Sequence, residues 1–380
     1  MSAAPSAHRP RSVHVLVTGG AGYIGSHAVL ALQAAGHFVS VLDDLSTGFA
    51  AAIPAGVRFH RGDVGDRAVL QRILADRPVD AIMHFAGSII VPESVSVPLD
   101  YYRNNTCSSR TLLAAAVSHG VPHFIFSSTA AVYGTPEVTP IREAAPTVPI
   151  NPYGCSKLMT EWMLRDAATA HGIGFAALRY FNVAGADPEG RSGQSTAGAT
   201  HLIKVACEVV AGRRPAVSVY GTDYPTDDGT AVRDYVHVSD LAAAHVLALG
   251  HLVAGGPSFI ANCGYGTGFS VSAVLDAVER VSGTSTHRTL AGRRDGDPPT
   301  LVADVERIKA LIGWRPRFAD LDQIVAHALA WERKLARNGG APAATDALRP
   351  DKYDLPLQDG SPQVWESHRP PVSSPNIGIT

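Results

Sequence analysis

The segment over residues 15–32, "VLVTGGAGYIGSHAVLAL", constrains the fold of this chain more than any other stretch. A β-branched apolar run leads through Gly20, Gly22 and Gly25, with Gly19 ahead of them, into a segment with helical periodicity. This is the G-x-G-x-x-G pattern of a strand-to-helix turn, where small residues let backbone amides and the helix N-terminus approach a pyrophosphate. The alternative is a glycine-rich turn that is needed only for tight packing.

The rest of the N-terminal half repeats this strand-and-helix rhythm as far as Leu178. The predicted strands are "VHVLVTG", "HFVSVLD", "VRFHRGD", "DAIMHFA", "HFIFSS" and "GFAALRY". Such alternation is typical of a parallel sheet covered by helices. We therefore expect an α/β fold, namely a Rossmann-type doubly wound parallel sheet with a smaller C-terminal α/β substrate-binding region.

The rhythm changes near residue 182, where Gly, Ser and Thr become frequent. We therefore expect the chain to divide into four parts. These are a disordered N-terminal extension over 1–12, a nucleotide-binding domain over 13–182, a smaller ligand-capping region over 183–337 that returns in part to the first domain, and a Pro- and Gly-rich tail over 338–380 that is disordered.

Composition limits the possible partners. The formal net charge of −2 over 380 residues provides no basic excess for nucleic acid, and 46% apolar content provides a large core. There is no run of about 18 apolar residues for a membrane span, and the start "MSAAPSAHRPRS" lacks the apolar core of a signal peptide. The four cysteines have neither metal-binding spacing nor the density of a secreted protein, which favours a cytoplasmic location. Sixteen histidines without an HExxH-type cluster predict no metal site.

Residues at the ends of the next strands indicate which dinucleotide binds. Asp43 and Asp44 lie near the ~20-residue offset at which a carboxylate binds a ribose 2′-hydroxyl. A carboxylate there would repel a 2′-phosphate, so NAD is favoured over NADP. Asp63 and Val64, in "RGDV", end a strand where an adenine could rest. His84, in "HFAG", is by itself expected to be a satisfied, partly buried histidine rather than a catalyst or ligand.

A tyrosine and a lysine share one face of a later helix. "INPYGCSKLMTEW" starts with the helix-entry pair Asn151 and Pro152, and Tyr153 and Lys157 follow four positions apart. Using a phenol as a base near neutral pH requires its pKa to fall by about three units, or about 4 kcal/mol. A cation at ~4 Å supplies about that much at an effective dielectric constant near 20. Lysine and an oxidised nicotinamide are together predicted to produce a phenolate that accepts a hydroxyl proton. Without the glycine turn, the same pair would indicate only surface or packing residues.

A further hydroxyl lies at the end of the fifth predicted strand, where "FIFSSTAAVYG" carries Ser127, Ser128 and Thr129. In this order, the glycine turn, the hydroxyl and the Tyr-x-x-x-Lys pair resemble the extended short-chain dehydrogenase/reductase superfamily. Within it, "VPESVSVPLDYYRNN", "NPYGCSKLMTE", "LRYFNVAGA" and "GTDYPTDDGTAVRDYVHVSDLAAAH" resemble the UDP-glucose 4-epimerase family. The resemblance covers about residues 13–335, and "GTDYPTDDGTAVRDYVHV" is its most specific part.

The resemblance implies an isomerase that uses NAD to interconvert UDP-glucose and UDP-galactose through a 4-keto intermediate. It implies that Tyr153 is the base, that Lys157 binds the nicotinamide ribose and tunes Tyr153, and that Thr129 lies beside the sugar O4. The implied NAD contacts are Gly19, Gly22, Tyr23, Ile24, Gly25, Asp43, Asp44, Asp63, Val64, Phe85, Ala86, Gly87, Asn104, Thr129, Tyr153, Lys157 and Phe181. The implied UDP-sugar contacts are Thr129, Tyr153, Asn182, His201, Leu202, Ser218, Tyr220, Arg233, Arg294 and Asp297.

The charges of the residues implied to contact the UDP-sugar fit a ligand with a diphosphate and a ribose. Two arginines can give a pyrophosphate bidentate contacts, and a carboxylate can hold a ribose diol. For Arg233 or Arg294 alone, a solvated surface charge is the alternative. The resemblance also implies a homodimer through "PLDYYRNNTCSSRTLLAAAVSHG" and the helix of Tyr153, for which ordinary packing on the sheet is the alternative. The pathway stays open between galactose catabolism and the supply of exopolysaccharide precursors.

Three residues depart from the family's pattern and leave the substrate range open: Ile89, His201 and Leu301. A 4-epimerase of UDP-pentoses, UDP-uronates or UDP-N-acetylhexosamines is therefore an alternative. Related dehydratases carry acids directly after the threonine, where this chain has Ala130 and Ala131, so elimination lacks its acid. A non-catalytic NAD-sensing protein is an alternative of another class, although such proteins tend to lose the tyrosine or the lysine.

Overall fold

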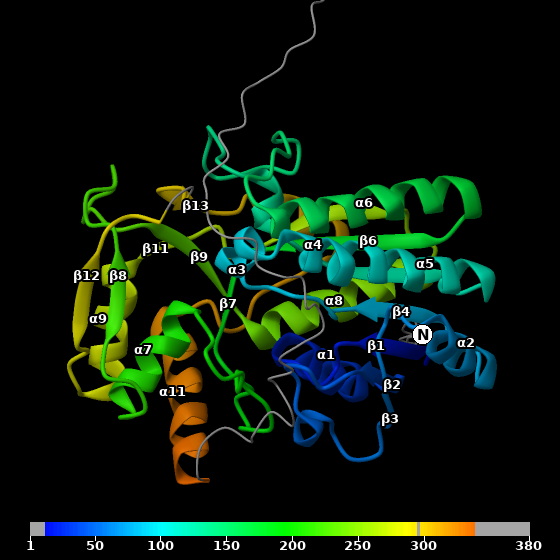
Figure 1. The fold of residues 1–380 in the computed structure, drawn as a ribbon, viewed down its shortest axis with the longest axis horizontal. Helices are drawn as coiled ribbons and strands as arrows, with labels where there is room; N and C mark the ends of the chain where they lie inside the picture. Colours follow the sequence, from blue (N-terminus) through cyan, green and yellow to red (C-terminus); the bar gives the residue numbers. More distant parts are fainter. Residues whose placement is uncertain (1–11, 295–296, 339–380) are drawn as a thin grey trace, which may run out of the picture. The chain divides into compact units, whose positions relative to one another are not determined.

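A seven-stranded parallel sheet in the order β10-β6-β5-β4-β1-β2-β3 organises the chain (Figure 1). The computed structural model describes residues 12–294 and 297–338. The strands of this sheet are β1 (His14–Thr18), β2 (Phe38–Asp43), β3 (Arg58–Arg61), β4 (Ala81–His84), β5 (His123–Thr129), β6 (Gly174–Tyr180) and β10 (Phe259–Cys263). All six strands predicted from the sequence are confirmed, and β10 adds a seventh from the C-terminal half.

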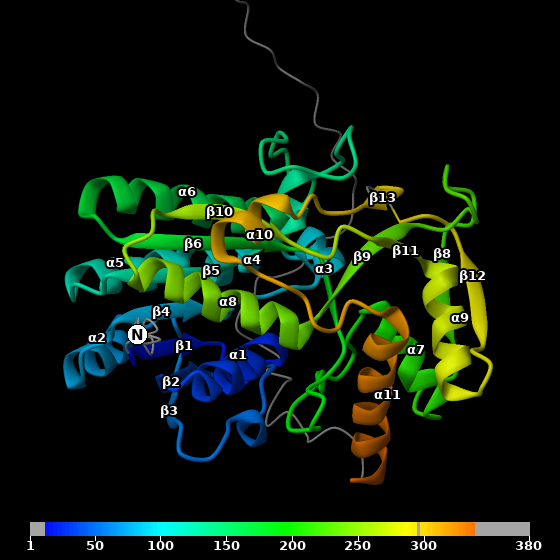
Figure 2. The same cartoon turned by 180° about the vertical axis from the view of Figure 1, so that it is seen from behind.

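Helices cover both faces of this sheet (Figures 1 and 2). One face carries α1 (Tyr23–Ala34), α8 (Val238–Val253) and α10 (Glu306–Ile312), and the other carries α2 (Arg67–Asp76), α5 (Ser108–Ser118) and α6 (Pro152–His171). Because side chains alternate along a strand, Val15 and Val17 join the apolar core beneath α1 and α8, while Leu16 joins the core on the opposite face. The predicted doubly wound α/β fold is confirmed.

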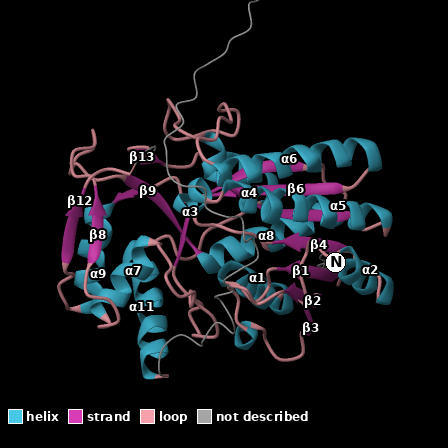
Figure 3. Ribbon diagram, in the orientation of Figure 1, coloured by secondary structure: helices cyan, strands magenta, loops and turns pink. Residues whose placement is uncertain are grey.

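The elements beside the sheet (Figure 3) include those that enclose a third apolar core, to which Ile203, Leu275 and Ile324 belong. They are β7 (Asn182–Ala184), α7 (Leu202–Val210), β8 (Val217–Tyr220), β9 (Val232–His237), β11 (Gly268–Ser270), α9 (Val271–Ser282), β12 (Arg288–Ala291), β13 (Thr300–Leu301) and α11 (Leu321–Arg337). The boundary near residue 182 stays a prediction. Apart from residues 12 and 338, the two terminal segments expected to be disordered lie outside the described residues.

Strand order fixes where a ligand can enter. β1 pairs with β2 on one side and with β4 on the other, so the connections leaving the C-terminal ends of β1 and β4 diverge at this point of the sheet. In open α/β sheets, ligands bind at such a switch point. No helix in the described part of the chain combines the length and the apolar character that crossing a bilayer requires.

The helix that carries the tyrosine and lysine pair begins as its sequence predicts. Asn151 is the N-cap of α6, and its side-chain oxygen accepts a hydrogen bond from the Gly154 amide at 2.9 Å. Pro152 occupies the first turn, where a missing amide costs nothing. The helix ends at Gly172, whose φ of 71° suits a residue without a Cβ.

Candidate active site

The glycine turn after β1 forms a narrow cradle at the N-terminus of α1. Gly19 has a φ of 72°, and a Cβ there would lie 2.5 Å from the Ala86 amide nitrogen. A Cβ on Gly25 would collide with the carbonyl oxygen of Gly19. Gly22 is the N-cap of α1, and no side chain among the described residues caps this helix. The first amides of α1 therefore point where an anion can bind, which fits a pyrophosphate.

The two carboxylates that end β2 differ in their surroundings. Asp43 is buried and accepts hydrogen bonds from the Ala21 amide at 2.9 Å and the Leu45 amide at 2.8 Å. Burial raises the pKa of Asp43, and these backbone hydrogen bonds lower it in part. Asp44 is exposed and accepts from the amide and hydroxyl of Ser46. Asp43 therefore links the glycine turn to the strand end, and its remaining lone pairs fit a ribose diol.

The segment after β4 is held by two asparagines of the π-helical segment η2 (Tyr102–Cys107). Asn104 donates to the Ser88 hydroxyl at 2.8 Å, while Asn105 accepts from the Ser88 amide at 2.8 Å. Asn105 also donates to the hydroxyl of Ser156 on α6 at 3.0 Å. Asn105 is thus a structural residue of the site that the sequence analysis missed. Its neighbour Asn104 was named only through the family resemblance.

Other predicted cofactor residues lie at the same sheet edge. Phe85 packs on the His245 ring with centroids 4.8 Å apart, and Phe181 is buried. Asp63 accepts from the Gly65 amide at 2.7 Å, and Val64 belongs to the core. Tyr23, Ile24, Ala86 and Gly87 flank the glycine turn or follow β4.

His84 is a satisfied core histidine, as expected from the sequence. Its Nδ1 lies 2.7 Å from the Thr18 hydroxyl and its Nε2 lies 2.8 Å from the Ser109 hydroxyl. Only 1% of the residue is exposed, so its burial is complete rather than partial.

The predicted catalytic residues come together where β5 meets α6. Lys157 Nζ donates to the main-chain carbonyl of Ser127 at 3.0 Å, and the ammonium lies 5.0 Å from the centroid of the Phe126 ring. Thr129 lies close enough to Tyr153 for its side chain to lower the pKa of the phenol. All three predicted catalytic residues are buried: Tyr153, Lys157 and Thr129.

The phenolate predicted for Tyr153 depends on Lys157 together with an oxidised nicotinamide, and the chain's own residues alone do not lower the pKa of the phenol. Burial raises the pKa of the Tyr153 phenol, and the Thr129 side chain offsets only part of that effect. Burial also lowers the pKa of Lys157 to about 8, which leaves most of the ammonium protonated at pH 7. The physical reason is that removing a phenolate from water costs more than these neighbours return. A further positive charge is needed to make the tyrosine a base.

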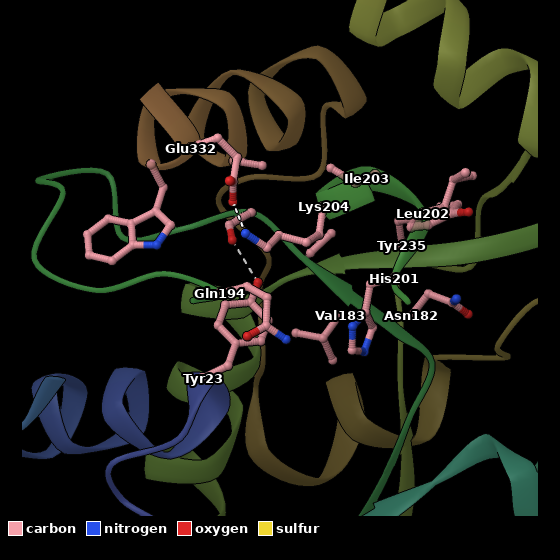
Figure 4. Close-up of a pocket in the computed structure, with 14 residues that line it drawn as sticks. Tyr23, Asn182, Val183, Gln194, His201, Leu202, Ile203, Lys204, Tyr235 and Glu332 are labelled. Atoms are coloured by element: carbon pink, nitrogen blue, oxygen red, sulfur yellow. Dashed lines mark hydrogen bonds and ion pairs between the residues drawn. The ribbon is translucent and has the colours of Figure 1, made fainter. Parts of the chain in front are cut away.

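On the other side of the glycine turn lies a cavity (Figure 4). Asn182, at the start of β7, and His201 and Leu202, where α7 begins, line it together with Tyr23 of α1. His201 Nδ1 is buried without a hydrogen-bond partner in the part of the chain that the structure describes. Burial lowers the pKa of His201, so its ring is neutral at pH 7. The cavity thus brings together one predicted cofactor residue and three predicted substrate residues.

Four of the five remaining predicted substrate residues form two pairs near β8 and β9. Arg294 lies over the ring of Tyr220, with its guanidinium carbon 3.8 Å from the centroid. Ser218 is on β8 with Tyr220, and its hydroxyl lies 3.2 Å from that of Thr289. Arg233, on β9, donates to Asp297 at 2.5 Å. Arg233 is therefore not the solvated surface charge that the sequence left as an alternative, since only 8% of it is exposed.

Comparison with known proteins agrees with this geometry. The model of the NAD dependent epimerase/dehydratase family matches residues 15–264. A UDP-glucose 4-epimerase of Azospirillum brasilense is 60% identical over 333 residues, covering 88% of this chain and 96% of the relative. The crystal structure of UDP-glucose 4-epimerase from Brucella ovis in complex with NAD matches with a TM-score of 0.82 and 43% identity, covering 84% of this chain and 98% of that one.

A second solved structure adds a nucleotide to the comparison. UDP-glucose 4-epimerase from Bifidobacterium longum in complex with NAD+ and UDP matches with a TM-score of 0.81 and 38% identity, covering 84% of this chain and 98% of that one. Each of these matches extends well beyond the glycine turn, into the region that carries the predicted substrate residues. The chain therefore belongs to the NAD dependent epimerase/dehydratase family, and it is similar there to the three UDP-glucose 4-epimerases named above.

Proposed function

We propose that this enzyme interconverts UDP-glucose and UDP-galactose by NAD-dependent epimerisation at C4. The observation that carries the proposal is the placement of the buried Tyr153, Lys157 and Thr129 where α6 meets the end of β5, at the same sheet edge as the glycine turn. Relatives that match most of the chain bear the name UDP-glucose 4-epimerase.

The residues at the switch point of the sheet, where β1 and β4 end, fit NAD. The uncapped start of α1 would hold the pyrophosphate, and Asp43 would hold the adenosine ribose, whose 2′-phosphate it would repel. Lys157 would hold the nicotinamide ribose. When bound, NAD would accept the hydride of C4 and return it to the opposite face of that carbon, and in its oxidised form it would supply a positive charge near the phenol.

The chain's own groups handle the proton. Tyr153 accepts the proton of the sugar 4-hydroxyl, and the Thr129 hydroxyl orients that oxygen through a hydrogen bond. The ammonium of Lys157 stabilises the phenolate, because its pKa of about 8 keeps it largely charged at neutral pH. After the 4-keto sugar has turned over, Tyr153 returns the proton to O4. No proton is gained or lost overall, as an isomerisation requires.

Turning the sugar over requires the nucleotide to stay anchored. Arg233 and Arg294 would grip the diphosphate, and Asp297, which pairs with Arg233, would orient that arginine or hold a ribose diol. Asn182, His201 and Leu202 would contact the rest of the nucleotide-sugar from the cavity of Figure 4. Leu301 pairs with Arg233 in register across β13 and β9, so its size bears on which sugars fit.

A direct assay tests this proposal. Purified protein is incubated with UDP-galactose without added NAD, and the anomeric proton signals are followed by NMR. We expect UDP-glucose to accumulate toward an equilibrium mixture. Bound NAD together with an unchanged C4 configuration would remove the proposal. A panel of UDP-N-acetylhexosamines, UDP-pentoses and UDP-uronates then defines the range at C2 and C6.

We also infer that the enzyme is a homodimer. Apolar side chains are exposed on helices of the segments that the family resemblance names: Leu99 of α4 (Pro98–Tyr101) is 79% exposed, and Trp162 of α6 is 46% exposed. Placing such side chains in a subunit interface removes apolar surface from water. Light scattering on the eluted protein should give twice the chain mass, and Leu99→Glu should shift it toward the monomer. A monomeric wild-type protein would reject the inference.

A further inference from the structure

Three consecutive residues at the end of β5 each contact one residue of α6. The three α6 residues are spaced by four, so they form a single stripe on the helix. The Thr129 side chain lies close enough to Tyr153 to lower the pKa of its phenol, the carbonyl of Ser127 accepts from Lys157 at 3.0 Å, and the hydroxyl of Ser128 donates to Glu161 at 2.6 Å. The first two contacts involve Tyr153 and Lys157, which have proposed roles in the reaction. The third contact involves Glu161, for which no contact with substrate or cofactor is proposed.

Glu161 is the carboxylate of a fully buried ion pair. Arg179 of β6 donates to it twice, from Nε at 2.9 Å and from Nη2 at 2.6 Å. The side chains of Arg179 and Glu161 are only 6% and 2% exposed. Arg179 also donates to the Tyr133 hydroxyl at 3.0 Å, which donates to Asn262 of β10 at 2.6 Å. One network therefore ties α6 to β5, β6 and β10.

Stability alone gives no clear reason for such a pair. A buried ion pair loses its hydration, and replacing both partners with apolar residues of similar volume is often neutral or stabilising. Its directional hydrogen bonds, however, specify one position of a helix on a sheet. Here they specify the position of α6 one turn beyond Lys157 and two turns beyond Tyr153.

We propose that Glu161 and Arg179 are positioning residues, which fix α6 against the end of β5 so that Tyr153 and Lys157 meet the sugar hydroxyl at the reactive distance. This inference rests on the proposed epimerase function. Displacement of a catalytic group by about 1 Å can reduce the rate about 100-fold. The nucleotide contacts proposed above lie on other elements, so the effect should fall on kcat and spare KM.

Two variants test the proposal. Ser128→Ala removes only the bond between β5 and Glu161, and it should lower kcat at least about threefold without changing the thermal midpoint. The double variant Glu161→Leu/Arg179→Met leaves no unpaired buried charge, and it should fold and retain NAD yet lose at least about tenfold in kcat. The control is Arg280→Met/Asp322→Leu, an exposed ion pair between α9 and α11 that should leave kcat unchanged.

The outcomes distinguish a role in positioning the catalytic residues from a general role in stabilising the fold. A fall in kcat with KM, NAD content and midpoint preserved supports the proposal, and a crystal structure of the variant should show Lys157 Nζ displaced from the Ser127 carbonyl. Unchanged kcat in the folded double variant overturns it, as does a parallel loss of NAD and rise in KM. If the double variant does not fold, Ser128→Ala decides by the same criteria. Wild-type protein without turnover would instead overturn the epimerase function itself.

Discussion

The hydroxyl of Ser26, on α1, lies 2.6 Å from the hydroxyl of Ser192. Ser26 belongs to the first turn of the helix that begins at the glycine cradle, and Ser192 belongs to the loop between β7 and α7. The loop follows β7, which starts at Asn182, and it ends at His201; both are predicted substrate residues. Tyr23 strengthens the link by donating to the Gly185 carbonyl at 2.7 Å. The cofactor helix and the nucleotide-sugar residues are therefore joined by one short path.

The same loop is anchored on its other side by α11, and this anchor yields a prediction about substrate affinity. Trp331 Nε1 donates to the Ser195 hydroxyl at 3.1 Å, and its ring leaves no space for a Cβ on Gly193. Trp331→Phe keeps the ring but removes this donor, whose net contribution is about 1 kcal/mol. We expect KM for UDP-galactose to rise about fivefold, with kcat and bound NAD unchanged. Steady-state kinetics measure this, with Trp162→Phe as the control, and an unchanged KM would show that the anchor is irrelevant to binding.

Asp43 gives a prediction about cofactor retention. Asp43→Asn keeps an acceptor for only one of the two amides, because Ala21 donates to Oδ2 and Leu45 donates to Oδ1, and it removes the charge that suits a ribose diol and excludes a 2′-phosphate. The purified variant should carry at least about tenfold less NAD and discriminate less against NADP. Nucleotide released on denaturation is quantified, with Asp76→Asn, at a surface ion pair, as the control. Full NAD occupancy in Asp43→Asn would argue against this role.

The central sheet could be predicted from the sequence because its strands are short apolar runs separated by helices. The start of α6 was predictable as well, since Asn151 and Pro152 act locally. β10 was not predicted, because its pairing with β6 joins residues about eighty positions apart and leaves no local pattern. Long-range pairing of this kind depends on the assembled fold.

Within the site, residue types were easier to predict than their electrostatics. The proximity of Tyr153 and Lys157 follows from helical periodicity, but the raised pKa of Tyr153 follows from burial, which periodicity does not measure. Glu161 could have been found, because it continues the same four-residue spacing. Asn105 offered no such signal, since its role depends on Ser88 and Ser156 meeting in the fold. Similarly, the pairing of Arg233 with Asp297 joins residues far apart in the chain.

Buried histidines predict a loss of stability in mild acid. Burial lowers the pKa of four histidines to about 4 or below: His27 to about 4, His84 to about 3, His237 to about 3 and His245 to about 4. The folded protein keeps these rings neutral, whereas the unfolded chain protonates them near pH 6.5. Their stabilisation is therefore complete above pH 6.5 and declines as the pH falls toward the folded values. Between pH 7.5 and 5.5, the contribution of each buried histidine to the free energy of unfolding falls by on the order of 1 kcal/mol.

One buried carboxylate opposes this trend. The pKa of Asp234 is raised by burial to about 6, so its contribution becomes more favourable as the pH falls through that value. Four histidines outweigh it, and we expect the thermal midpoint to fall by about 5 °C or more between pH 7.5 and 5.5. Scanning calorimetry measures this. His245→Leu should reduce the pH sensitivity and exposed His119→Leu should not, whereas an equal or higher midpoint at pH 5.5 would refute the linkage.

The most direct measurement concerns Tyr153, the residue that every step of the proposed proton transfer requires. Tyr153→Phe removes the phenol and leaves the glycine cradle, Asp43 and Lys157 in place. Turnover of UDP-galactose is compared between variant and wild type at equal bound NAD, with Tyr102→Phe as the matched control. Loss of general acid-base catalysis should reduce kcat by about 10² to 10⁴ while NAD stays bound. Turnover within about twofold of wild type would show that the proton moves by another route.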